Sequence, residues 1–233
     1  MSKELHTYYW PQLSTETEQI LSGDEAKHAI KVMRLQVGDD LRVIDGKGLE
    51  AHASAIGITK KELHFEVSSF TNAAGPRPGF HLAIAPTKQM DRLEWCLEKC
   101  TEIGLARITP IVCQNSERRN LRTDRLERIA IAAMKQSGSS YLPQVDEPIS
   151  INDFLNSYDQ GAPLMIAHCR DEEKAHLDKT FEAICVMIGP EGDFTQKEID
   201  DAISLGAKAV HLGPKRLRTE TAGVVACTLM NLR

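Results

Sequence analysis

Hydrophobic and polar residues alternate through much of the first seventy positions. Residues 49–55 and 63–67 carry an apolar side chain at every second position, which is the period of a half-buried strand. The segment Leu41-Arg42-Val43-Ile44 leads into Asp45-Gly46-Lys47-Gly48, a sequence typical of a turn between strands. A short helix is expected only over residues 24–33. The pattern therefore predicts a small, mostly β domain.

The segment 71–79, TNAAGPRPG, marks the end of that domain. It contains two glycines and two prolines, a composition typical of connections between domains. We therefore predict a first domain over residues 1–72, a linker over 73–79 and a second domain over 80–233.

In the second domain, short apolar runs alternate with amphipathic segments. Thr195 and Glu198 form the capping-box pattern that opens a helix, and Gly104 and Gly206 follow two of the predicted helices. Alternating strands and helices favour an α/β fold with a parallel sheet covered on both faces. Strands are expected at 81–85, 108–113, 164–168, 184–188 and 210–212, and helices at 91–103, 122–137, 195–205 and 220–232.

Composition excludes several classes of protein. The 233 residues are 42% hydrophobic and 26% charged, which is a globular balance and unlike that of disordered chains. The longest aliphatic run, 183–188, is far shorter than the roughly 20 residues that cross a membrane, and the N-terminus has no signal-peptide pattern. We expect a cytoplasmic protein. Its six cysteines lack zinc-site spacing, so we expect no metal and buried free thiols.

Charge is unevenly distributed along the chain. The net charge is −5, yet residues 76–140 carry a net +4, and five arginines lie between positions 118 and 128. Guanidinium groups suit phosphate contacts, which permits a nucleic-acid partner. The same arginines could instead form ion pairs with Glu117, Asp124 and Glu127 on a solvated helix face. Both interpretations stay open.

Two glycine-bearing loops stand at the ends of predicted strands. They are Ile188–Phe194, IGPEGDF, and Leu212–Gly223, LGPKRLRTETAG. Ligands of open α/β sheets bind at the carboxyl ends of strands, and glycine lets a backbone approach a ligand closely. Glu191, Arg218 and Glu220 bring charge to that edge. Tight strand-to-helix turns would use the same glycines and prolines.

These two loops resemble the C-terminal signature of the SPOUT methyltransferase superfamily, and in particular its RsmE family. Further blocks match in order, and the resemblance covers nearly the whole chain. They are His28–Leu35 with Asp45-Gly46, Glu98–Gly104, Ser116-Glu117-Arg118, and Gln136-Ser137. The chain departs from the commonest pattern at Asp193, where glycine is usual, at Arg216, where isoleucine is usual, and at Ser139, near a usual arginine.

The resemblance implies a PUA-like β-barrel domain followed by a SPOUT-type α/β domain with a trefoil knot, assembled as a homodimer. It also implies S-adenosylmethionine as the cofactor, held by three loops. The residues expected there are Ala167, His168, Ile188, Gly189, Gly192, Leu212, Gly213, Leu217 and Ala222.

The resemblance further implies methyl transfer to N3 of one uridine in bacterial 16S ribosomal RNA, in the small subunit. That nitrogen must lose a proton, so the site needs a proton acceptor and, in a dry pocket, a group that stabilises negative charge. Arg218 and Glu220 are the expected catalytic residues, with Glu191 as the alternative acid–base group. Arg218 could instead brace the knot, and either glutamate could favour a helix N-terminus.

The RNA is expected to be held electrostatically. The expected phosphate contacts are Arg34, Lys88, Arg118 and Arg119. The cluster Tyr8-Tyr9-Trp10 either stacks on a base or packs against its own sheet. Two other functions stay open: a non-catalytic RNA-binding assembly factor, and a SPOUT ribose 2′-O-methyltransferase.

Overall fold

The computed structural model describes residues 5–73, 79–158, 161–171, 173–177 and 183–231. Contacts divide the chain into two compact units, Met1–Arg77 with Met134–Leu142, and Pro78–Ala133 with Pro143–Arg233. The predicted linker lies almost entirely outside the described residues. The predicted domain boundaries stay a prediction.

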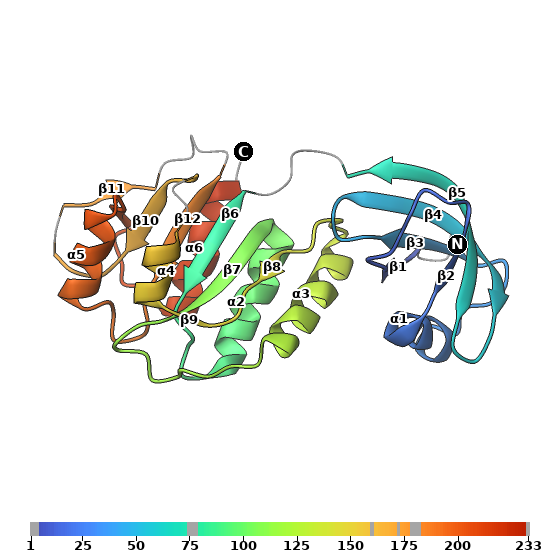
Figure 1. The fold of residues 1–233 in the computed structure, drawn as a ribbon, viewed down its shortest axis with the longest axis horizontal. Helices are drawn as coiled ribbons and strands as arrows, with labels where there is room; N and C mark the ends of the chain where they lie inside the picture. Colours follow the sequence, from blue (N-terminus) through green and yellow to red (C-terminus); the bar gives the residue numbers. More distant parts are fainter. Residues whose placement is uncertain (1–4, 74–78, 159–160, 172, 178–182, 232–233) are drawn as a thin grey trace. The chain divides into compact units, whose positions relative to one another are not determined.

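The first unit contains a five-stranded sheet that curls around its own core (Figure 1). The strand order is β1-β3-β4-β5-β2, with β1 parallel to β3 and the other pairs antiparallel. The predicted strands correspond to β3, β4 and β5, whereas β1 and β2 carry no alternation long enough to predict them singly. The bounds are β1 His6–Tyr9, β2 Glu18–Leu21, β3 Asp40–Ile44, β4 Leu49–Ile58 and β5 Leu63–Asn72.

The predicted helix of the first unit is present, but it changes from an α-helix to a π-helix along its length. The α-helix α1, Gly23–Lys27, continues as the π-helix η1, His28–Val32. The segment ends near Arg34, whose φ of 53° lies in the left-handed region. Tyr8 is fully buried in the core of this unit, so the packing alternative holds for it, while Tyr9 and Trp10 are half-buried.

Residues 134–142 belong with the first unit, although 134–137 are the last turn of a helix, Thr123–Ser137, that begins in the second. The backbone amide of Gly48 donates to the Ser140 carbonyl at 3.0 Å. Lys135 Nζ donates to Glu25 Oε1 at 2.7 Å. The block Gln136-Ser137 therefore lies where the chain returns to the first unit, which linear sequence patterns do not reveal.

The second unit is built on an eight-stranded, wholly parallel sheet. Its order is β11-β13-β10-β12-β6-β7-β8, with β9 also pairing with β7. The bounds are β6 Phe80–Ile84, β7 Leu105–Val112, β8 Gln144–Val145, β9 Ile149–Ser150, β10 Leu164–Ala167, β11 Ala175–His176, β12 Ile184–Ile188 and β13 Lys208–His211.

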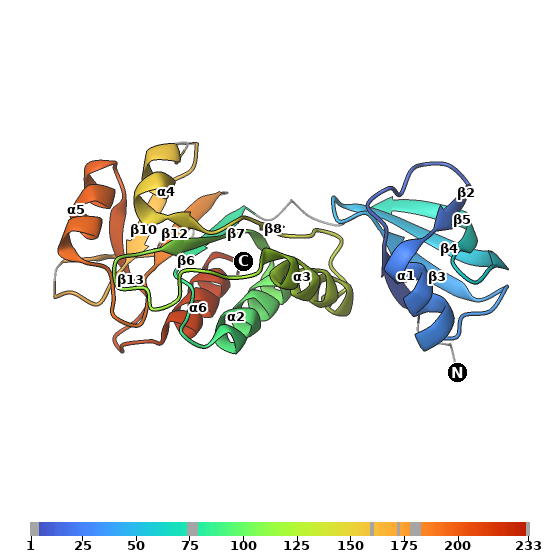
Figure 2. The ribbon, with the colours of Figure 1, turned by 60° about the horizontal axis from the view of Figure 1, so that its bottom comes forward.

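Helices cover both faces of this sheet, as the alternating pattern predicts. Figure 2 shows α2 and α6 on one face and α4 and α5 on the other. The path through the expected knot stays a prediction. The helix bounds are α2 Met90–Ile103, α3 Thr123–Ser137, α4 Ile151–Ser157, α5 Gln196–Ser204 and α6 Thr219–Asn231.

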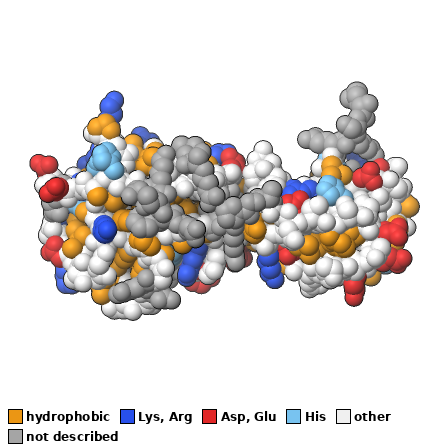
Figure 3. Space-filling model, turned by 90° about the horizontal axis from the view of Figure 1, so that it is seen from above, with side chains coloured by type: hydrophobic (Ala, Val, Ile, Leu, Met, Phe, Trp, Pro, Cys, Tyr) orange, Lys and Arg blue, Asp and Glu red, His pale blue; other side chains and the backbone are white. Residues whose placement is uncertain are grey.

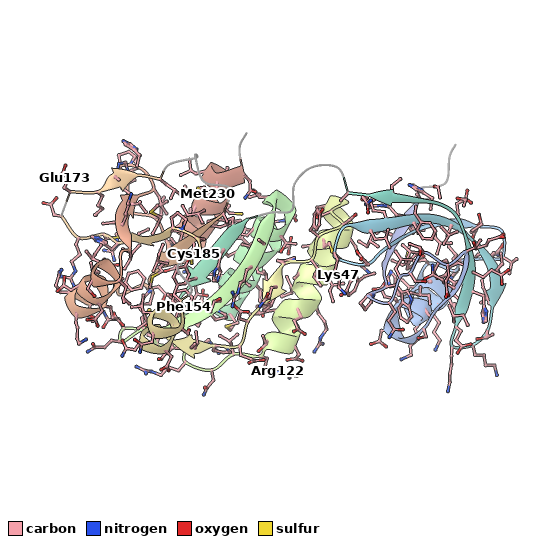
Figure 4. The ribbon with its side chains drawn as sticks, turned by 45° about the horizontal axis from the view of Figure 1, so that its top comes forward. Lys47, Arg122, Phe154, Glu173, Cys185 and Met230 are labelled. Atoms are coloured by element: carbon pink, nitrogen blue, oxygen red, sulfur yellow. The ribbon has the colours of Figure 1, made fainter. Side chains whose placement is uncertain are left out.

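Alternate side chains of β6 supply the cores on the two faces. Ala83 packs in a cluster with Phe154 of α4 and Cys185 of β12, both labelled in Figure 4. Leu82 and Ile84 face α6 instead, where a Cβ at Gly223 would lie 3.3 and 3.1 Å from them. The same Cβ would lie 2.8 Å from Cys96 Sγ, so a glycine is required for α6 to pack this closely.

Local end signals are confirmed in two helices. Gly104 ends α2 in the left-handed conformation, at a φ of 117°. Thr195 and Glu198 form the reciprocal capping box that begins α5. The C-terminal end of α2 and the N-terminal end of α5 are therefore set by local patterns that can be identified in the sequence.

The six cysteines are free, and five are buried as expected, but Cys169 is exposed. Among the described residues, no helix is both long and apolar enough to cross a membrane. The described part of the chain also holds no group of three His, Cys, Asp or Glu side chains that could bind a metal ion.

Candidate active site at the carboxyl edge of the sheet

Three loops meet at one edge of the sheet because β10, β12 and β13 are parallel and end there. They border two cavities of about 230 and 370 Å³. The residues that line both cavities are Ala167, Cys169, Arg216, Leu217 and Ala222. The larger of the two lies within the roughly 300–1,000 Å³ usual for small-molecule sites.

Most of the predicted cofactor residues border these cavities. Leu212 and Leu217 are half-buried and supply the apolar walls. Gly192 is placed differently, because a Cβ there would meet Asn115 Cβ at 3.2 Å. The smaller cavity is lined by Ala167, His168, Leu212, Gly213, Leu217 and Ala222, and the larger by Ile188 and Gly189 among others.

Gly189 is held tightly between two elements. A Cβ at this position would lie 3.0 Å from Phe194 Cδ2 and 3.2 Å from the Phe194 backbone nitrogen. Phe194 is fully buried, so it has little room to move. Thr219 Oγ1, at the start of α6, donates to the Gly189 carbonyl at 3.1 Å. Gly189 thus lets the loop after β12 fit between Phe194 and α6.

Glu220 is a buried carboxylate in the first turn of α6. Its side chain is 8% exposed, and Oε1 lies 3.9 Å from Arg92 Nη1. The other oxygen, Oε2, is buried and has no hydrogen-bond partner among the described residues. Buried polar atoms are usually hydrogen-bonded, so this oxygen is available to a donor on a ligand.

Arg218 lies beside Glu220 at the start of α6, and its carbonyl accepts the Ala222 amide at 2.8 Å. Its side chain is exposed and borders two cavities, the one of about 370 Å³ and one of about 750 Å³ that Glu220 also lines. The expectation of a dry pocket around Arg218 is therefore not met by this chain alone, and a bound substrate or a second protomer would have to exclude the water.

Glu191 forms hydrogen bonds that connect its own loop, after β12, to the loops after β6 and β13. Its Oε1 accepts the Lys88 backbone amide at 3.0 Å, and its carbonyl accepts Arg216 Nη2 at 3.3 Å. The carboxylate is exposed. This geometry favours Glu220 over Glu191 as the acid–base group.

Arg92 and Trp95 are site residues that sequence reasoning missed. Both lie in the first turns of α2 and line the cavity of about 750 Å³ with Arg218 and Glu220. They stand on the polar face of an amphipathic helix, where nothing in the sequence separates them from other surface residues. Only the position of α2 directly after β6, at the carboxyl edge of the sheet, could have indicated them.

The RNA candidates of the second unit differ in how far their charge is neutralised. Lys88 Nζ is 2.8 Å from Glu117 Oε2, and this hydrogen bond raises the pKa of the Lys88 ammonium. Arg118 donates from Nε and Nη2 to the Lys88 carbonyl, at 3.3 and 3.2 Å. Arg119 Nη2 donates to the Gln114 carbonyl at 3.3 Å. These two arginines therefore use backbone acceptors, and neither contacts a carboxylate of the described residues.

The other three arginines of the run pair with acids, as the alternative interpretation expected. Arg122 and Arg128 both contact Asp124, and the bond from Arg122 is the main reason why the pKa of Asp124 is lowered. Arg125 Nε is 2.6 Å from Glu94 Oε1. Figure 4 labels Arg122 at the start of α3. Among the described residues, the run thus divides into two arginines without a carboxylate partner, Arg118 and Arg119, and three that form ion pairs.

Arg34 lies in the first unit and is exposed. On the face drawn in Figure 3, the Lys and Arg side chains of the described residues lie in separate places. This face therefore shows no broad basic patch among the described residues.

The chain thus joins a curled β domain to an α/β domain that has cavities at the carboxyl edge of its parallel sheet, where proteins of this fold class bind their ligands. Residues 76–231 match the family model described as RNA methyltransferase domain, and residues 21–68 match RNA methyltransferase PUA domain. The chain belongs to this RNA methyltransferase family. The fold class expected from the family resemblance is confirmed.

Relatives align over nearly the whole chain. "Ribosomal RNA small subunit methyltransferase E" of Rickettsia conorii is 27% identical, over 97% of this chain and 94% of its own. A "probable rRNA-methyltransferase" structure from Porphyromonas gingivalis is 36% identical with a TM-score of 0.87, covering 97% of this chain and 98% of that one. A structure of "Ribosomal RNA small subunit methyltransferase E" from Neisseria gonorrhoeae, bound to S-adenosyl methionine, is 26% identical to this chain with a TM-score of 0.87. The match covers 97% of each chain.

Proposed function

We propose that this protein uses S-adenosylmethionine to methylate N3 of one uridine in the 16S ribosomal RNA of the small subunit. The observation that carries the chemistry is the buried Oε2 of Glu220, which has no hydrogen-bond partner among the described residues, on a side chain that lines the cavity of about 750 Å³ together with Arg218. Relatives named as small-subunit ribosomal RNA methyltransferases, and one solved with the cofactor bound, support the substrate and cofactor classes. A ribosomal RNA substrate implies that the protein acts in the cytoplasm.

The cofactor supplies an electrophilic methyl group on a sulfonium. Glu220 Oε2 accepts the proton from uracil N3, and the guanidinium of Arg218 stabilises the negative charge that spreads to the neighbouring carbonyl oxygens. Arg92, 3.9 Å from Glu220, keeps a positive charge beside the carboxylate. The apolar walls at Leu212 and Leu217, and the close backbone at Gly189, are suited to the cofactor.

The direct test is methyl transfer from radiolabelled S-adenosylmethionine to ribosomal RNA or small subunits from a strain that lacks the gene, followed by nucleoside mass spectrometry. N3-methyluridine is the expected product. A 2′-O-methylated nucleoside would support the ribose methyltransferase instead. RNA binding without transfer would support the assembly factor.

Replacing Gly189 with valine is expected to lower cofactor affinity by at least about tenfold, because overpacking against Phe194 forces the loop to shift. Isothermal titration calorimetry with S-adenosylmethionine measures this loss. Gly192→Val is the informative comparison, since its Cβ would meet the Asn115 side chain instead. Unchanged affinity in Gly189→Val would contradict the assignment of this loop to the cofactor.

Replacing Arg118 and Arg119 together with alanine is expected to weaken RNA binding and to reduce the salt slope by up to about 0.9 for each phosphate that is no longer neutralised. Cofactor affinity should not change. The matched control is Arg122→Ala with Arg128→Ala, which removes two cations that already pair with Asp124. Filter binding over a range of salt concentrations measures both variants. Equal losses of affinity in the two would show that only net charge matters.

We further propose a homodimer in which α6 contributes to the contact. Val224, Val225, Leu229 and Met230 are apolar and only half-buried, and Met230 is labelled near the end of α6 in Figure 4. A second copy would cover them and would help to exclude water from Arg218. Light scattering should give the mass of a dimer at micromolar concentration, and a monomer would contradict the proposal.

A further inference from the structure

Asp193 holds a backbone conformation that glycine usually supplies. Its φ is 62°, and Arg34 is the other non-glycine residue with a positive φ among those described. Aspartate tolerates the left-handed region better than most residues. A glycine is usual at this position in the family that the chain resembles. The replacement therefore costs little in backbone strain and adds a carboxylate at the edge of the cavity of about 370 Å³.

This carboxylate joins two of the cofactor loops. Asp193 Oδ2 accepts the Cys169 backbone amide at 2.9 Å, and Oδ1 accepts the Phe194 amide, also at 2.9 Å. Cys169 lies in the loop after β10, whereas Asp193 and Phe194 lie in the loop after β12. Hydrogen bonds to a charged acceptor are stronger than those between neutral groups. Glycine could make neither bond.

The backbone of Asp193 is fixed from a third side. Asn115 Nδ2, in the loop after β7, donates to the Asp193 carbonyl at 3.0 Å and to the Gly192 carbonyl at 3.2 Å. Arg170 Nη2 reaches across to the Phe194 carbonyl at 3.3 Å. The backbone of Asp193 is thus held in place by its neighbours, and its carboxylate in turn holds the backbone amide of Cys169.

The second departure from the usual pattern has a similar geometry. Arg216 Nη2 donates to the Glu191 carbonyl at 3.3 Å, which links the loop after β13 to the loop after β12. Isoleucine could not make this bond. Arg216 is exposed, so we expect its contribution to be smaller than that of Asp193.

We propose that Asp193 is a positioning residue for the cofactor, which holds the Ala167-His168-Cys169 segment in its binding geometry before the cofactor arrives. The proposal rests on the cofactor given under the proposed function. A site that is already ordered avoids the entropic cost of ordering a loop on binding. The benefit therefore falls on cofactor affinity, while the chemistry at Glu220 and Arg218 is untouched.

The test is Asp193→Gly, which restores the usual residue and keeps the backbone conformation accessible. Loss of a hydrogen bond to a charged group predicts about tenfold weaker binding of S-adenosylmethionine in calorimetry. At saturating cofactor, kcat should stay within about twofold of the wild type and the KM for RNA should not change. Amide exchange of the segment 167–171 in the cofactor-free protein should become faster.

A second variant separates the carboxylate from the backbone. Asp193→Asn tolerates the same φ but has one oxygen for the two amide donors, Cys169 and Phe194, so it can keep only one of the two bonds and should lose no more affinity than Asp193→Gly does. Asp200→Asn, on the exposed face of α5, is the control and should bind as the wild type does. Wild-type affinity in Asp193→Gly would overturn the proposal, and so would a matching fall in kcat. A wild-type protein that does not bind S-adenosylmethionine would refute the proposed function itself.

Discussion

Arg218→Ala is expected to reduce turnover by about 100- to 1,000-fold, which is the usual cost of removing one group that stabilises developing negative charge. The guanidinium is permanently charged and offers donors in a fixed fork. As uracil N3 loses its proton, charge moves onto the neighbouring oxygens, so Arg218 binds the anion more strongly than the neutral base. That difference is what accelerates the reaction.

A purely structural role of Arg218 can be tested separately from a catalytic one. Arg218 is exposed and begins α6 through its backbone carbonyl, a bond that alanine preserves. Folding and calorimetric cofactor binding should therefore survive in Arg218→Ala. Arg218→Lys should recover only part of the activity, because a point charge does not reproduce the fork. Lys197→Ala, on the far helix α5, is the matched loss of a surface cation.

Either of two results would remove Arg218 from the mechanism. If the Arg218→Ala protein does not fold, the role of Arg218 is to stabilise the expected knot. Turnover within about threefold of the wild type would leave no catalytic role for Arg218.

Local patterns predicted most of the longer elements because each is set by short-range physics, whereas the short helix α4 and the two-residue strands β8, β9 and β11 were not predicted. The capping box at Thr195 and the glycine after α2 are encoded within one turn of helix, and both are confirmed. The parallel sheet followed from alternating strands and helices. The strands β1 and β2 were missed singly because four residues are too few to display a period.

The site was predictable only where sequence neighbours share one loop. Gly189, Leu217 and Arg218 belong to two legible motifs at strand ends. Arg92 lines two of the same cavities as Arg218, although it lies on α2, 126 residues earlier in the sequence. A local sequence pattern cannot predict a contact between residues so far apart. The hydrogen bond from Cys169 to Asp193 is equally invisible, because it depends on the neighbouring positions of β10 and β12 in the sheet.

Glu220→Gln is expected to lower turnover by about 100- to 10,000-fold, the range typical of a general acid–base group. Glutamine keeps the volume and the approach to Arg92, so the packing of α6 should be retained. It cannot accept the N3 proton, however. Because Oε2 is buried and has no partner among the described residues, the substitution breaks no hydrogen bond to them at that atom, and the folded protein should remain stable enough to assay.

Glu191→Gln is the comparison that separates the two carboxylates. Its Oε1 accepts the Lys88 amide, which a glutamine oxygen also does, so its turnover should stay close to that of the wild type. A large fall in turnover in Glu191→Gln with little change in Glu220→Gln would exchange their roles.

The chemistry itself supplies a further test of Glu220. Fluorine at C5 of the target uracil makes the N3 proton more acidic, so its removal depends less on the catalytic carboxylate. If Glu220 removes that proton, 5-fluorouridine RNA should restore part of the activity of Glu220→Gln and change the wild-type rate less. A structural role would lower the rates on both RNAs by the same factor, and single-turnover measurement on the two substrates decides between them.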